Sequence, residues 1–199
     1  MRTKLYAASL LLAPLFYAIS SFFWQGNGQY SGYSVTSGTL IIIGSVFWVI
    51  AFSALFDALK EKTPGYASIG LLFAVYGCLC GGVAFALRDI FTSVFNISHH
   101  DMLVALSQHP VLTDIVFWAG GPAFPLSLLI LGIVLTSTKT VELWVGISIA
   151  LAGVLFPLSR IPRIELIAHI ADAFMLIPLA NLSWQLFSQD GLNKQLVAN

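Results

Sequence analysis

The sequence predicts an all-α, polytopic integral membrane protein in which six transmembrane helices form one bundle. Three observations support this prediction: few charged residues, six long apolar segments, and an unequal distribution of lysine and arginine between the loops. Charged residues make up 9% of the chain, whereas a soluble domain carries about 25%. With 58% hydrophobic residues and a mean hydropathy of +0.88, the composition excludes an ordinary soluble fold and a disordered chain.

We interpret residues 1–199 as a single transmembrane domain that contains six apolar segments. They lie at about 5–24, 38–59, 67–87, 115–135, 143–159 and 164–187. A hydrocarbon core of about 30 Å requires about 20 apolar residues per helix, and every segment except the shorter fifth one meets this length. The first segment is longer than the roughly 7–15 apolar residues of a cleaved signal peptide, so we interpret it as a membrane helix.

The basic residues indicate the orientation, because lysine and arginine accumulate in cytoplasmic loops. If the N-terminus is inside, the inner side holds Arg2, Lys4, Lys60, Lys62, Lys139 and Lys194, and the outer side holds Arg88, Arg160 and Arg163. We therefore expect both termini in the cytoplasm and the protein in a bacterial cytoplasmic membrane, with the lipid bilayer as its partner. A formal net charge of zero and the lack of a basic patch predict no nucleic acid partner.

A weak internal echo relates the second and third helices to the fourth and fifth. The motif Val-Phe-Trp ends at Trp48 and recurs ending at Trp118, and Gly70 in the following helix corresponds to Gly146. Self-similarity at a fixed spacing is typical of duplication. The echo predicts that the two helix pairs superpose with Trp48 over Trp118.

The sixth helix carries ionisable residues on one side of its outer half. Glu165, His169 and Asp172 are spaced i, i+4 and i+7, which places them in a narrow stripe. A carboxylate that faces lipid costs about 2.5–3.5 kcal/mol on insertion scales, so we expect the stripe to face the bundle interior. Arg160 and Arg163 come shortly before this helix and supply opposite charges.

The fourth helix contains a predicted break at Gly120-Gly121-Pro122, with a further proline at Pro125. Proline removes a backbone hydrogen bond, and loosened backbone inside a membrane is tolerated where it lines a cavity or is buried in protein. Counted from the helix ends, the break lies at the depth of Asp172. These features predict a pocket that opens to the outer face between the fourth and sixth helices, bordered by Gly120 and Gly121.

Two readings of this polar region predict different contacts. In the first, which the sequence favours, the protein binds or transports a small polar ligand, a lipid headgroup or a proton. Glu165 and Asp172 are then acceptors, His169 is a titratable partner, and Arg160 or Arg163 is an anion anchor. In the second, an accessory protein uses the same residues as structural ion pairs. An arginine then lies within hydrogen-bonding distance of Asp172, and side chains fill the space beside it.

A third reading is a metal-dependent membrane enzyme that acts on a lipid at the outer leaflet. His99, His100 and His169 lie on the predicted outer side and are suitable ligands for zinc or another divalent metal. However, a short interfacial helix that begins at Asp101 explains the adjacent histidines equally well, and we predict no cofactor. The sequence also contains no nucleophile elbow, phosphate loop or dinucleotide fingerprint, which favours a function other than catalysis.

Overall fold

The structure is a computed structural model that describes residues 2–27 and 30–198. Six of its helices are long and apolar enough to cross a membrane, which confirms the six predicted helices. They are Arg2–Ser21, Val35–Leu59, Pro64–Val94, Pro110–Ser137, Leu143–Arg160 and Glu165–Ser188.

Four of these spans are single α-helices, and the other two are continuous helices built from several elements. The single helices are α1 (Arg2–Ser21), α2 (Val35–Leu59), α8 (Leu143–Arg160) and α9, which continues to Ala198 (Glu165–Ala198). The composite spans are α3 (Pro64–Gly77), η1 (Cys78–Ala84) and α4 (Phe85–Val94), and then α6 (Pro110–Thr113), η2 (Asp114–Ala119) and α7 (Gly120–Ser137). The elements η1 and η2 are π-helical turns, which are often found where helices carry strain or function.

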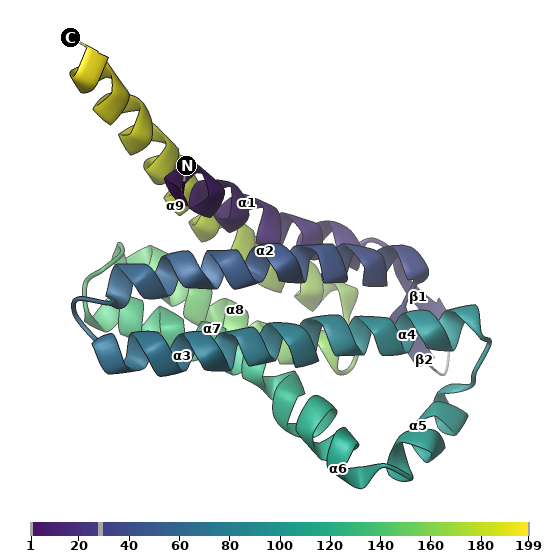
Figure 1. Ribbon diagram of the computed structural model, residues 1–199. Helices are drawn as coiled ribbons and strands as arrows, with labels where there is room; N and C mark the ends of the chain where they lie inside the picture. Colours follow the sequence, from purple (N-terminus) through teal and green to yellow (C-terminus); the bar gives the residue numbers. More distant parts are fainter. Residues whose placement is uncertain (1, 28–29, 199) are drawn as a thin grey trace.

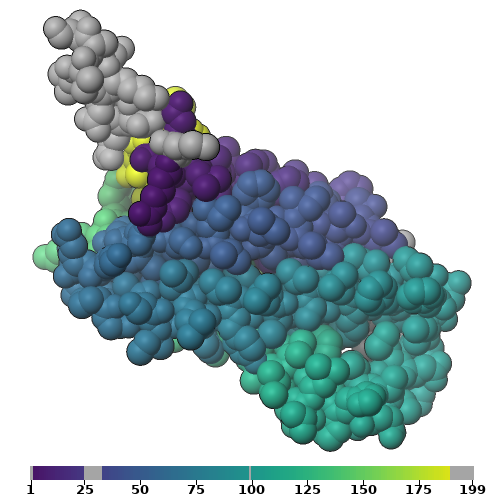
Figure 2. Space-filling model, viewed as in Figure 1, coloured from purple at the N-terminus to yellow at the C-terminus, as the bar shows by residue number. Residues whose placement is uncertain are grey.

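The contacts among the six spans close into a ring. In order around the ring, α1 packs on α2, α2 on α3, α3 on α7, α7 on α8, α8 on α9, and α9 on α1. Helix α8 therefore contacts both α7 and α9. Helix α5 (His99–Ser107) and α6, which is the first part of the fourth span, project sideways from the bundle (Figures 1 and 2).

Aromatic side chains fill the middle of the ring. Tyr17 of α1, Trp48 of α2, Phe124 of α7 and Phe156 of α8 meet there, with ring centroids 5.2 Å apart for Trp48 and Phe124 and 5.1 Å apart for Phe124 and Phe156. Trp48 has 0% exposure and Tyr17 has 1%. Such rings bury large apolar areas and hold neighbouring helices in a fixed register.

A short β-hairpin, which the sequence did not predict, joins α1 to α2. Strand β1 (Trp24–Asn27) pairs antiparallel with β2 (Tyr30–Tyr33), and Trp24 lies opposite Tyr33. The next helix, α2, is capped by Ser34, whose hydroxyl accepts a hydrogen bond from the backbone N–H of Ser37 over 3.0 Å. The hairpin therefore lies at the end of the bundle at which α1 ends and α2 begins.

The structure corrects several predicted boundaries. The third span ends at Val94 rather than at 87, and the fourth begins at Pro110 rather than at 115, where proline is favoured as a first helical residue. The short helix α5 begins at His99 rather than at Asp101, because the hydroxyl of Ser98 caps it by accepting the Asp101 backbone N–H over 3.1 Å.

The residues of the internal echo lie in different surroundings. Trp48 is fully buried, whereas Trp118 is 75% exposed. Gly70 and Gly146 are more alike, because a Cβ added at either would meet the preceding helix, at Phe56 and at Thr136 respectively. The duplication of the two helix pairs stays a prediction.

Candidate functional site

The buried charged residues in the described part of the chain are Asp89, Arg160 and Asp172. All three lie at the end of the bundle where α1 and α8 end and α9 begins, which we call the polar end. Together with Ser21, Arg88 and Arg163, they form a set of connected hydrogen bonds and ion pairs that we call the polar cluster.

The first half of the polar cluster joins α1, α8 and α9. Arg160 donates from Nη2 to Oδ1 of Asp172 over 2.9 Å, and the two side chains are 7% and 3% exposed. The hydroxyl of Ser21 donates to Oδ2 of Asp172 over 2.6 Å and accepts from Arg160 over 3.2 Å. Arg160 also donates to the hydroxyl of Ser159 over 3.3 Å. Both carboxylate oxygens of Asp172 are therefore bonded.

The second half of the polar cluster joins α4, the hairpin and the turn between α8 and α9. Arg88 donates to Oδ1 of Asp89 over 2.6 Å, and Arg163 donates to Oδ2 over 3.1 Å. The backbone N–H of Tyr33 donates to the same Oδ2 over 3.0 Å. Arg163 adopts a left-handed backbone conformation with φ of 55°, which is unfavourable for a side chain of this kind. Its contacts with the polar cluster offset this cost.

Aromatic rings connect the two halves into an alternating series, which we call the cation–π ladder. The guanidinium carbon of Arg163 lies 4.3 Å from the ring centroid of Tyr33 and 5.2 Å from that of Trp24. The guanidinium carbon of Arg160 lies 5.0 Å from the Trp24 ring and 4.7 Å from the ring of Phe156. Contacts of this kind contribute about 0.5–2 kcal/mol each, with larger values when the groups are desolvated.

Asp172 faces the bundle interior as expected, but the rest of the predicted stripe does not join it. Glu165 is exposed, because it is the first residue of α9 and lies about 10 Å further along the helix, beyond its neighbours. His169 is turned to the side of α9, where its ring packs on Phe22 with centroids 4.4 Å apart. Of the two predicted arginines, Arg160 pairs with Asp172 and Arg163 pairs with Asp89.

The predicted position of the Gly-Gly-Pro break beside the sixth helix is wrong. The ring places α8 between α7 and α9, so the break faces η1 instead. A Cβ at Gly120 would lie 2.3 Å from the Cβ of Cys80, and one at Gly121 would lie 3.0 Å from the ring of Phe85. These glycines have no side chain because two helices approach too closely there to accommodate one.

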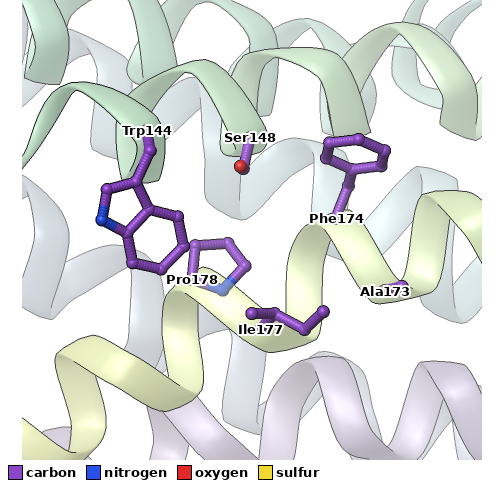
Figure 3. A pocket seen from close by; sticks show the side chains of 6 residues that line it. All are labelled: Trp144, Ser148, Ala173, Phe174, Ile177 and Pro178. Carbon is purple, nitrogen blue, oxygen red and sulfur yellow. The ribbon is translucent and has the colours of Figure 1, made fainter.

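A concavity among the described residues lies between α8 and α9, and no residue of the polar cluster lines it (Figure 3). It is a groove of about 200 Å³ between α8 and α9, lined by Trp144, Ser148, Ala173, Phe174, Ile177 and Pro178. The lining is almost entirely apolar. Trp144 is 16 residues before Arg160 on α8, about 24 Å along that helix, whereas Ala173 and Phe174 directly follow Asp172 on α9. The groove therefore extends from near the level of Asp172 toward the opposite end of the bundle. The indole N–H of Trp144 donates to Glu142 over 2.7 Å.

The predicted metal ligands are not brought together in the part of the chain that the structure describes. No three histidine, cysteine, aspartate or glutamate side chains in that part form a group that would hold a metal ion. His100 is exposed on α5, and His169 packs on Phe22, whereas the side chain of His99 lies outside the described residues.

Sequence reasoning missed Ser21, Trp24, Tyr33 and Asp89 as members of this site. Asp89 directly follows Arg88 at the end of an apolar segment, and this adjacent pair was the available signal. Comparison of the chain with protein-family models, curated proteins and solved structures finds no match. The function is therefore argued from the residues themselves.

Proposed function

We propose that the protein is a multi-pass membrane protein with an accessory role, in which the ion pairs of the polar cluster hold the helix ends together. We call this structural role of the polar cluster the clasp. The observation that carries this proposal is the state of Asp172, because both of its carboxylate oxygens are bonded within the protein. A carboxylate that received a ligand or a proton from outside would need an accessible oxygen. This arrangement matches the contacts expected for structural ion pairs, and it removes the main support for an open polar pocket.

Other features also favour the accessory role over transport or catalysis. Aromatic side chains occupy the middle of the ring, where a transport pathway would pass. The groove between α8 and α9 lacks the convergent polar groups that fix a polar ligand. The third reading, a metal-dependent enzyme, has no group of ligands to support it among the described side chains.

The proposal includes the orientation, with the polar end outside and both termini in the cytoplasm. Lys60, Lys62 and Lys139 lie in the short loops at the opposite end, as the positive-inside rule requires of the cytoplasmic side. In a variant with Cys78 and Cys80 replaced by alanine, a cysteine at His100 should react with an impermeant thiol reagent added to intact cells. A cysteine at Lys139 should react only after permeabilisation. The reverse pattern would contradict the orientation.

The clasp is tested by replacing Asp172 with asparagine. Asparagine keeps the shape of the side chain but leaves the Arg160 guanidinium without its counter-ion. Breaking a buried pair in this way costs about 3–5 kcal/mol, so thermal unfolding of the detergent-purified protein should occur at a clearly lower temperature. The matched control is Asp57→Asn, because Asp57 also binds an arginine but lies at the exposed opposite end. An Asp172→Asn protein as stable as the control would exclude the clasp.

A further inference from the structure

The cation–π ladder holds a concentration of buried N–H groups that have no acceptor. In the described part of the chain, five buried side-chain atoms lack a hydrogen-bond partner, and three of them are Nε1 of Trp24, Nε of Arg160 and Nη1 of Arg163. Buried donors are nearly always paired, with protein, with water or with an ion. Three unpaired donors on consecutive members of one ladder therefore indicate a missing acceptor.

The charges of the polar cluster point to the same conclusion. Among the described residues, its ion pairs join three guanidinium groups, of Arg88, Arg160 and Arg163, to two carboxylates, of Asp89 and Asp172. Glu165 is exposed and forms no ion pair with the described residues. Contacts with aromatic rings stabilise the guanidinium groups but provide no oxygen or halide to accept an N–H bond. A buried guanidinium is costly unless its N–H groups are bonded, so an anion beside the unpaired donors of Arg160 and Arg163 would be favourable.

We propose that the polar cluster binds one singly charged anion that accepts N–H bonds from Trp24, Arg160 and Arg163. Two sources supply this chemistry: a free halide such as chloride, and the phosphodiester of a lipid headgroup at the same membrane surface. Arg160 is buried and Trp24 is partly exposed, so Trp24 marks the side from which the anion approaches. The proposal goes beyond the clasp, which requires only the ion pairs themselves.

The experiment measures anion-dependent thermal unfolding of the full-length protein in an uncharged detergent. Sodium chloride is titrated against sodium gluconate, a bulky anion, at constant ionic strength. A parallel series adds phosphatidylglycerol in gluconate. A ligand that binds the folded state at ten times its Kd should raise Tm by roughly 3–6 °C and then saturate. Saturation with chloride assigns the site to a free ion, and saturation with phosphatidylglycerol alone assigns it to a headgroup.

The decisive variant is Trp24→Phe, which keeps an aromatic ring between the two arginines but removes the N–H donor. We expect this variant to raise the half-saturating anion concentration at least tenfold, because the anion loses one of its donors. Trp118→Phe is the matched control, because Trp118 is 75% exposed and belongs to neither the ladder nor the polar cluster. If Trp24→Phe does not fold, Arg163→Lys replaces it, since lysine keeps the charge but loses the Nη1 donor.

Two results would overturn the proposal. One is a wild-type protein whose Tm responds to neither chloride nor phosphatidylglycerol. The other is a Trp24→Phe protein that responds as the Trp118→Phe control does. Neither result bears on the clasp, because the clasp is tested by the stability of Asp172→Asn at a fixed anion concentration.

Discussion

Arginine–aspartate pairs lie at both ends of the bundle, and one pair from each end can be compared because the two differ mainly in burial. At the polar end, Arg160 and Asp172 join α8 to α9, and their side chains are 7% and 3% exposed. At the opposite end, Arg2 and Asp57 join α1 to α2, and their side chains are 71% and 36% exposed. In both pairs a hydroxyl of α1 also binds the carboxylate, from Ser21 over 2.6 Å in the first and from Tyr6 over 2.7 Å in the second.

The two pairs therefore have the same chemistry but different energetics. An exposed pair is screened by solvent, and many such pairs contribute nothing measurable to stability. A buried pair has already lost its hydration, so removing either partner leaves an uncompensated charge in a medium of low dielectric constant. An arginine–aspartate contact alone therefore does not show that a pair stabilises the fold. The surroundings of Arg160 and Asp172 make that pair costly to break.

The largest expected effect comes from replacing one member of the buried pair and leaving the other in place. The single variant Arg160→Met should destabilise the protein by about 3–5 kcal/mol, because Asp172 then lacks its counter-ion. The double variant Arg160→Met with Asp172→Val should recover much of this loss, since apolar residues of similar volume often replace a buried pair without cost. Unfolding midpoints of the two singles and the double form a double-mutant cycle. Additive losses would show that the two side chains are not coupled.

This energetic argument also explains what the sequence was able to predict. The inward orientation of Asp172 followed from the cost of exposing a carboxylate to lipid, which is a property of the residue itself. The existence of the six helices likewise followed from the length of each apolar segment. Both inferences use local information, and both agree with the structure.

The contacts that the sequence did not predict depend on the order of helices in the ring. The pairing of Arg163 with Asp89 joins residues 74 positions apart, and no local pattern indicates it. The third helix was predicted to end before Arg88 because two charges resemble a loop, whereas pairing of Arg88 with Asp89 lets the helix continue to Val94. The exposure of Glu165 depends on where the neighbouring helices end, and this cannot be inferred from the amino-acid composition.

A smaller effect is expected for the hydroxyl that bridges the buried pair. Ser21→Ala removes the bond to Asp172 and the bond from Arg160, and should cost about 1–3 kcal/mol because charged buried groups lose a partner. Ser20→Ala is the control, since the buried hydroxyl of Ser20 binds only the backbone carbonyl of Tyr17 in its own helix. Thermal unfolding should separate the two variants. Equal losses would mean that Ser21 contributes packing rather than the bridge.

Two residues with left-handed backbones provide a comparison in which the sign of the effect differs. Arg163 has φ of 55° at the polar end, and Lys139 has φ of 52° in the exposed turn at the opposite end. Glycine relieves the strain of this conformation but raises the entropy of the unfolded chain. Lys139→Gly should therefore raise the free energy of unfolding by about 0.5 kcal/mol. Arg163→Gly should lower it by about 1–3 kcal/mol, because the ion pair with Asp89 is lost. A stabilised Arg163→Gly protein would show that this ion pair contributes little.

The smallest effect is expected for the exposed pair at the opposite end. Arg2 donates to Asp57 and to Tyr6, yet it remains largely in solvent, so water replaces these contacts when they are lost. Arg2→Gln should leave the unfolding temperature unchanged within experimental scatter at moderate salt. The charge-swapped protein, with Arg2→Asp and Asp57→Arg, should also fold and remain as stable as the wild type, because an exposed pair tolerates exchange of its partners. The equivalent exchange of Arg160 and Asp172 should prevent folding, since each buried side chain is held by neighbours of fixed position. If Arg2→Gln lowered the unfolding temperature as much as Asp172→Asn does, burial would not be the property that distinguishes the two ends.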